Sequence, residues 1–374
     1  FAPQQPDLNW ANPAVRQELY RMIRFWMEEG VEGFRLDVID QVAKEPDRKI
    51  TANGPHLMEF LRELNRETWG GANLVTVGEA WGANLDRARQ YSAPDGTVFS
   101  MVFQFEQMVL DHTGNKWEPK DFALPQLKES IARWQKGLHG CGWNSLFWNN
   151  HDLPRIVSRW GDDGAHRVDS AKALAVALHG LQGTPYIYQG EELGMTNVDF
   201  PLEDLRDLES INAYHELIAK GEPEELAMAH IHRMMRDNAR TPMQWTAGPN
   251  AGFTTGTPWM KLNPNHTEIN AEAALADPDS VFYTYQKLIA LRKEHPVFVE
   301  GDFTLLCPED KQVFAYLRRG AGQELLAAVN LSGQQAAFDL PEAFRGCTPL
   351  LVTQGAPQDG VLRPWEAVLW LRSL

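Results

Sequence analysis

Short apolar runs alternate with amphipathic segments over the first half of this chain, and this alternation restricts its fold more than any other feature. The runs are rich in β-branched and aromatic residues, whereas the segments between them repeat apolar residues at helical spacing. Such a pattern predicts βα units around a buried parallel sheet. The expected strands are Val31–Ile39, Leu74–Val77, Val98–Phe105, Ser145–Trp148 and Tyr186–Tyr188. The expected helices are Pro13–Glu29, His56–Trp69, Pro125–Gln135 and Val168–Leu181.

The alternation of apolar runs and amphipathic segments becomes irregular after Gly190. Beyond Pro296 it gives way to short segments of alternating hydrophobicity, separated by Pro and Gly. The later segments predict a small antiparallel β domain. We therefore predict an α/β domain over residues 1–296, with an insertion at about 191–270, and an all-β domain over residues 297–374. The expected elements are helices at Asp204–Lys220, Pro223–Arg236 and Ser280–Glu294, and strands at Phe303–Leu306, Val313–Arg318, Leu325–Val329 and Ala367–Leu371.

Composition excludes several classes of function. The net charge of −15 argues against a nucleic-acid partner, because phosphates require patches of Lys and Arg. The same charge fits a neutral substrate. Cys141, Cys307 and Cys347 form an odd set without metal-ligand spacing, so we expect reduced thiols and a cytoplasmic location. No apolar run reaches the ~18 residues of a membrane span, which predicts no membrane association.

Three acidic residues follow or end expected strands: Asp37, Glu79 and Asp152. In a parallel α/β barrel such positions line one mouth, where reactive residues gather. Arg35 precedes Asp37 by two positions and can hold that carboxylate ionised, and His151 offers a donor beside Asp152. Each acid alone could simply cap the following helix. Three together favour a catalytic set, since glycosidic cleavage uses one carboxylate as nucleophile and another as proton donor.

Several segments resemble signature regions of the α-amylase superfamily of glycoside hydrolases: Gln5–Trp10, Gly33–Asp37, Val77–Glu79 and Phe147–Asp152. Arg236–Trp245 is similar to a stretch typical of the oligo-1,6-glucosidase and dextran glucosidase (glucan 1,6-α-glucosidase) branch, and the resemblance runs over essentially the whole chain. It implies the C-terminal portion of a (β/α)8 TIM barrel, about five of eight strands, followed by an antiparallel β-sandwich domain.

The resemblance also implies a role for each matching residue. Asp37 would be the nucleophile that forms a covalent glucosyl ester, and Glu79 would protonate the leaving oxygen and then activate water. Asp152 would bind hydroxyls of the reacting sugar. Arg35, His151 and Arg240 would contact the nucleophile or the sugar. The implied outcome is retention of the α configuration, with transglycosylation as a side activity.

Val38 and Trp81 carry the prediction of linkage. In this family Val after the nucleophile resembles enzymes acting on α-1,6 bonds, whereas Ala or Thr is usual in α-1,4 and sucrose-acting relatives. We therefore predict an exo-acting α-glucosidase that hydrolyses α-1,6 bonds of isomalto-oligosaccharides or dextran ends. Trp81 would form a stacking wall for the leaving sugar, with a core aromatic as the alternative. Glu191, Glu192 and Lys116 could reach outer sugars, although charged loop residues are usually only solvated.

Three other functions stay open as alternatives. A trehalose-6-phosphate hydrolase shares the Asp-Val pair but requires a basic pocket, and an α-1,4-glucosidase remains an alternative if Val38 misleads. A non-catalytic scaffold member of the superfamily would have lost the acids that this chain keeps.

The chain departs from the family at its start, where Phe1–Pro3 reads as a loop without an initiator Met. The family's first three barrel strands precede the Gln5–Trp10 segment, and none of them is in this sequence. Since about five strands cannot close a barrel, we expect a fragment whose partner is the missing N-terminal portion of the same protein. We expect oligosaccharide substrate as the other partner, no metal ligand and no cofactor in this chain. A calcium ion would belong to the missing portion.

Overall fold

The computed structural model describes residues 4–374, so the loop expected at residues 1–3 lies outside the described residues. The chain divides into two compact units. The first runs to Gln107 and includes Arg133–Ser145, and the second contains Met108–Ala132 and Leu146–Leu374. Among the described residues, no helix combines the length and the apolar composition that a membrane crossing requires. The predicted domain boundary between residues 296 and 297 stays a prediction.

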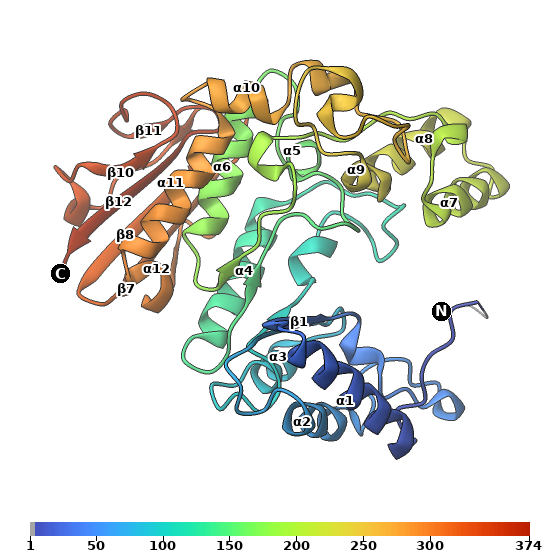
Figure 1. Ribbon diagram of the computed structural model, residues 1–374. Helices are drawn as coiled ribbons and strands as arrows, with labels where there is room; N and C mark the ends of the chain where they lie inside the picture. Colours follow the sequence, from blue (N-terminus) through green and yellow to red (C-terminus); the bar gives the residue numbers. More distant parts are fainter. Residues whose placement is uncertain (1–3) are drawn as a thin grey trace. The chain divides into compact units, whose positions relative to one another are not determined.

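The first unit is built from βα repeats, coloured blue to cyan in Figure 1. Its helix α1 begins as the sequence predicts, because the Asn12 side chain accepts a hydrogen bond from the backbone N–H of Ala14 and Pro13 takes the first helical position. An apolar core that includes Tyr20, Leu61 and Phe99 holds the repeats together. The elements are α1 (Pro13–Glu28), β1 (Gly33–Leu36), α2 (Leu57–Glu67), β2 (Val75–Glu79), α3 (Leu85–Tyr91) and β3 (Met101–Phe103).

The strands β1, β2 and β3 pair in parallel in that order. The register places Leu36 opposite Gly78 and Glu79 opposite Phe103, so the strands end at a common edge. Gly78 cannot be replaced there without movement, because an added Cβ would lie 2.8 Å from the Phe99 ring. This register brings the residues after β1 beside those after β2.

The βα pattern continues through α4 (Leu124–Leu138), β4 (Ser145–Leu146) and α6 (Arg167–His179). A parallel bridge joins Val102 to Asn144, next to β4, and β4 pairs with β5 (Thr184–Pro185). The predicted strand at Tyr186–Tyr188 is therefore wrong, because the strand residues precede it. Tyr186 still donates its backbone N–H to Leu146 at 2.8 Å, but the aromatic run beyond it is not part of the sheet.

Helices fill most of the second unit between β5 and residue 300. α7 (Leu208–Ala219) and α8 (Glu224–Met234) form a subcluster around Tyr214, Leu217 and Ile231, and α11 (Val281–Glu294) packs on α6. The remaining helices in the described part of this unit are α5 (Ile156–Arg159), α7 (Leu208–Ala219), α8 (Glu224–Met234), α9 (Asp237–Arg240), α10 (Ala271–Ala276), α11 (Val281–Glu294) and α12 (Val297–Glu300).

A five-stranded antiparallel sheet of order β10-β12-β8-β7-β6 ends the chain, shown in red in Figure 1. One face carries its own core, which includes Leu326, Val368 and Trp370 and is covered by the two-stranded sheet β11-β9. On the other face, the Tyr316 hydroxyl donates to the carbonyl of Ala177 in α6 at 3.0 Å. The second layer of the expected sandwich is thus only two strands wide. The strands are β6 (Thr304–Leu306), β7 (Val313–Gly320), β8 (Gln323–Asn330), β9 (Ala336–Ala337), β10 (Pro349–Val352), β11 (Val361–Leu362) and β12 (Ala367–Ser373).

Candidate active site

Asp37 and Glu79 lie on neighbouring strands of the first unit. Asp37 follows the last residue of β1, and Glu79 is the last residue of β2. Because these strands run in parallel and in register, both carboxylates are at the same edge of the sheet. The backbone turns sharply after Asp37, where Val38 adopts a left-handed conformation with φ 38°. This region is unfavourable for a β-branched residue, and such strain gathers at functional sites.

Arg35 joins the two carboxylates. Its Nη1 lies 2.5 Å from Asp37 Oδ1, and its Nη2 forms an ion pair with Glu79 Oε2. The two acids differ in environment, since the Glu79 side chain is 3% exposed and that of Asp37 is 70% exposed. Burial raises the pKa of Glu79, and the neighbouring Asp37 raises it further, against the opposing effects of Arg35 and Trp81. The pair therefore combines an accessible carboxylate with a buried acid that holds its proton to higher pH.

Trp81 contacts the buried acid directly. Its indole N–H donates to Glu79 Oε1 at 2.7 Å, and its ring stacks on Phe105 with centroids 3.8 Å apart. Trp81 is 41% exposed, so it is not a core aromatic. Phe105 lies just after β3 and was missed as a site residue. Its signal was its place at the end of the third apolar run, on the strand edge that carries the acids.

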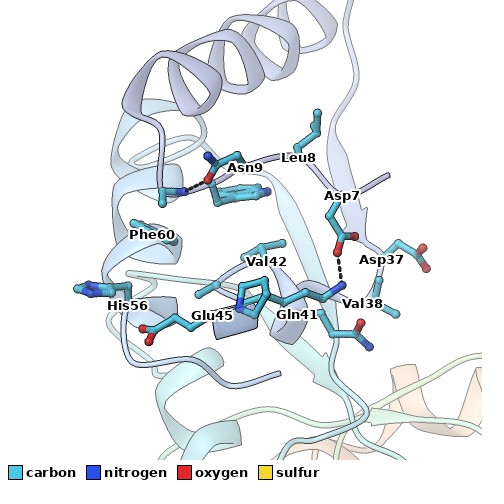
Figure 2. Close-up of a pocket in the computed structure, with 15 residues that line it drawn as sticks. Asp7, Leu8, Asn9, Asp37, Val38, Gln41, Val42, Glu45, His56 and Phe60 are labelled. Carbon is cyan, nitrogen blue, oxygen red and sulfur yellow. Dashed lines mark hydrogen bonds and ion pairs between the residues drawn. The ribbon is translucent and has the colours of Figure 1, made fainter. Parts of the chain in front are cut away.

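A cavity of about 440 Å³ opens beside Asp37 within the first unit. Figure 2 shows Asp37 and Val38 at one end of this cavity and His56 and Phe60 at the other. Trp10 and Val42 supply more of its apolar lining. A further wall is fixed by an ion pair between Asp7 and Lys44. A cleft lined by apolar groups with a few charged ones suits a small polar ligand such as a sugar.

Asp152, His151 and Arg240 form a group of their own in the second unit. Arg240 Nη2 donates to Asp152 Oδ1 at 2.6 Å, and its Nε donates to the His151 carbonyl at 2.8 Å. The His151 Nε2 lies 3.3 Å from Asp152 Oδ2. Arg236 stands 3.5 Å from the same carboxylate. The structure thus brings together the three residues that the sequence placed on one sugar.

The buried acid Asp207 holds Arg236 in place beside this group. Arg236 Nη2 lies 2.5 Å from Asp207 Oδ1. Burial alone would raise the pKa of Asp207, but hydrogen bonds from Arg236 and Ser210 outweigh it and lower the pKa to about 2. Asp207 therefore stays ionised and fixes Arg236 beside Asp152. Sequence reasoning missed it, because nothing near it in the chain signals the partner 29 positions away.

The alternative that Glu191 could contact outer sugars is wrong. This side chain is buried and accepts hydrogen bonds from the Tyr285 hydroxyl and from Asn149 Nδ2, both at 2.6 Å. Lys116 forms an ion pair with Glu209 at 2.8 Å. In the part of the chain that the structure describes, no group of three or more His, Cys, Asp or Glu side chains is placed to hold a metal ion.

Comparison with known proteins places these sites in a family. Residues 1–301 match the model for the alpha amylase catalytic domain, and residues 303–361 match that for the maltogenic amylase C-terminal domain. A glucan 1,6-alpha-glucosidase of Streptococcus dysgalactiae subsp. equisimilis is 51% identical over 98% of this chain and 70% of its own length. An oligo-1,6-glucosidase of Parageobacillus thermoglucosidasius is 46% identical, with the same two coverages.

Two trehalose-6-phosphate hydrolases are similar too. A trehalose-6-phosphate hydrolase of Escherichia coli (strain K12) is 46% identical over 100% of this chain and 70% of its own length. The crystal structure of a Bacillus licheniformis trehalose-6-phosphate hydrolase matches with a TM-score of 0.94 and 43% identity, over 100% of this chain and 71% of that one. These matches confirm the predicted fold class, a portion of a (β/α)8 barrel followed by an antiparallel β domain. The chain belongs to the alpha-amylase family of glycoside hydrolases.

Proposed function

We propose that this protein is a retaining α-glucosidase that cleaves terminal α-1,6-linked glucose from isomalto-oligosaccharides or dextran. The observation that carries the proposal is the arrangement of Asp37 and Glu79, which lie on neighbouring strand ends and share Arg35. Retaining glycosidases need two carboxyl groups only ~5–5.5 Å apart, one as nucleophile and one as acid. The names of the two α-1,6-acting relatives support the same linkage.

In the first step, a carboxylate oxygen of Asp37 attacks the anomeric carbon of the terminal glucose. The bond from this carbon to the glycosidic oxygen breaks as Glu79 transfers its proton to that oxygen, leaving a glucosyl ester on Asp37 and an ionised Glu79. In the second step, Glu79 takes a proton from water, and the resulting oxygen nucleophile displaces Asp37. Two inversions give net retention. The raised pKa of Glu79 suits the first step, since the acid must arrive protonated.

The remaining residues have supporting roles in this proposal. Arg35 holds the Asp37 carboxylate through their ion pair. For Asp152, His151 and Arg240, which contact one another, we propose the role that the family resemblance implies, binding hydroxyls of the reacting sugar. Val38 and Trp81 shape the space for the leaving sugar. Nothing in the two-carboxylate mechanism requires a cofactor, and we propose that none is used. The three free cysteines fit our expectation of a cytoplasmic location.

Trehalose-6-phosphate hydrolysis is the second candidate, because two of the similar proteins carry that activity in their names. Turnover of isomaltotriose, maltose and trehalose 6-phosphate in parallel separates the candidates. We expect isomaltotriose to give the highest kcat/KM, with NMR detecting α-glucose as the first product. Asp37→Asn should lower turnover by at least about 10³-fold, because the reaction depends on the ionised nucleophile. Near-normal turnover by this variant would reject the assignment of Asp37.

A further inference from the structure

Asp40 is a buried acid three residues after Asp37, and it is 1% exposed. It lies in the short 3-10 helix Ile39–Gln41 that follows the left-handed turn at Val38. Its Oδ2 accepts a hydrogen bond from the backbone N–H of Gly82 at 2.8 Å. Gly82 is in turn three residues after Glu79. One side chain therefore connects the loop that carries the nucleophile to the loop that follows the acid.

We infer that Asp40 is a positioning residue that holds the loop after β1 and the loop after β2 at the separation that the two catalytic carboxylates require. The inference rests on the function proposed above. The Asp40 side chain accepts its hydrogen bond from Gly82, and Asp40 acts on the catalytic pair through this contact. A displacement of about 1 Å in such a pair costs on the order of 10²-fold in rate.

Asn53, from a third segment of the chain, forms hydrogen bonds to both loops. Its backbone N–H donates to the Asp40 carbonyl at 2.7 Å, and its Nδ2 donates to the Gly82 carbonyl at 3.2 Å. The hydroxyl of Tyr91, in α3, donates to Asn53 Oδ1 at 3.1 Å. The two loops are thus fixed to each other and to the helix behind them. This network is anchored on two buried side chains, Asp40 and Tyr91, and such anchoring restricts loop movement and suits pre-organisation.

Gly82 has a steric reason to be glycine. A Cβ added there would lie 2.5 Å from Asn53 Nδ2 and 3.0 Å from Asp40 Oδ2. Gly82→Ala would therefore displace the Asn53 and Asp40 side chains that hold the two loops together, while position 40 remains Asp. The strained turn at Val38 also needs support from its surroundings, since the left-handed region is unfavourable for a β-branched residue. The anchor two residues later supplies that support.

The test uses four variants of the full-length protein, compared by kcat and KM on isomaltose. We expect Asp40→Ala and Gly82→Ala each to lower kcat by about 10²-fold, with a smaller change in KM. Asp40→Asn keeps an oxygen acceptor for the Gly82 N–H and should retain most of the activity. The double variant Asp40→Ala/Gly82→Ala should be no worse than either single one, because both break the same contact.

Asn65→Ala is the matched control for loss of stability. Asn65 is buried in the same unit and donates to the Gly96 and Val98 carbonyls, away from both catalytic loops. If Asn65→Ala lowers kcat as much as Asp40→Ala, or if Asp40→Asn is as poor as Asp40→Ala, the inference is wrong.

The pH profile of kcat/KM supplies a readout that a merely structural role would not move. Separating the loops exposes Glu79 to water and distances it from Asp37, and these two changes lower its pKa. They are the larger influences on Glu79, so they outweigh the opposite effect of its greater distance from Arg35. The alkaline limb of Asp40→Ala should therefore shift to lower pH, and an unshifted limb would contradict the inference. A wild-type protein without glucosidase turnover would instead reject the proposed function. An active wild type with an unaffected Asp40→Ala variant would reject the positioning role alone.

Discussion

The indole N–H of Trp81 donates to Glu79 Oε1 at 2.7 Å, so an exposed aromatic residue is hydrogen-bonded to the buried acid of the site. Phe105 stacks on the same ring and holds it in place. The contact gives Trp81 a second role besides the one proposed for it at the leaving sugar. A hydrogen bond donated to a carboxylate favours the ionised form, and this one opposes the burial that raises the pKa of Glu79.

Trp81→Phe should shift the alkaline limb of the kcat/KM profile to higher pH. The variant removes the donor but keeps an aromatic ring against Phe105, so Glu79 loses a group that stabilises its ionised form. Its pKa then rises, and the protonated acid persists to higher pH. Trp26→Phe, an exposed Trp on α1, is the control and should leave the profile unchanged. A shift of the Trp81→Phe limb to lower pH would contradict this account.

Val38→Ala should change the choice of linkage. Val38 lies at the end of the cavity beside Asp37 (Figure 2), and in the proposed function its side chain limits how the leaving sugar is placed. Removing two methyl groups should raise the ratio of kcat/KM for maltose over that for isomaltose by about 10-fold, within the range for one or two methylenes in a pocket. Val42→Ala lines the same cavity and is the control, because it should change KM for both sugars alike. An unchanged ratio in Val38→Ala would remove Val38 from the determinants of linkage.

Glu79→Gln should separate the need for a proton donor from the need for the nucleophile. The amide cannot protonate the leaving oxygen, so kcat/KM for isomaltose should fall by about 10²–10⁴-fold. An α-glucosyl fluoride needs little protonation of its leaving group and should lose much less in kcat/KM. Asp37→Asn, in contrast, should reduce the first step on both substrates. Equal losses on the two substrates for Glu79→Gln would show that Glu79 is not the acid.

Local signals predicted most of the elements that position the site. The bounds of α1 differ from the predicted helix by one residue, because Asn12, Pro13 and Gly30 all mark its ends. The aromatic run Tyr186–Tyr188 was wrongly predicted to be a strand, since an extended apolar segment need not pair with a neighbouring strand. The Tyr188 hydroxyl instead donates to the Ala239 carbonyl at 2.9 Å, a contact that no local pattern encodes. α3 was missed because it is short and charged, although Asn84 caps it.

The candidate site likewise has features that the sequence predicts and features that it does not. Parallel strands with a common register made it predictable that Asp37 and Glu79 would be neighbours. The contacts that tune them were not predictable, because Asp40 and Gly82 are 42 positions apart, and a backbone N–H carries no sequence signal. The burial of Glu191 was equally hidden. Its partner Tyr285 is 94 positions away, on α11, so the sequence showed only a charged residue in a loop.

Glu191→Gln should stabilise the protein increasingly as the pH rises. Burial raises the pKa of Glu191 from 4.5 to about 7, against hydrogen bonds from Tyr285 and Asn149. Between these two values the unfolded chain loses this proton while the folded chain keeps it, so wild-type stability falls as the pH rises through this window. Gln carries no such proton and fits the same space.

The Tm of Glu191→Gln minus that of the wild type, measured by calorimetry, should therefore be greater at about pH 8 than at about pH 5. Glu268→Gln, at an exposed position, is the control and should show a constant difference. A Glu191→Gln difference that stays constant or shrinks with rising pH would mean that Glu191 is ionised in the native protein throughout this range.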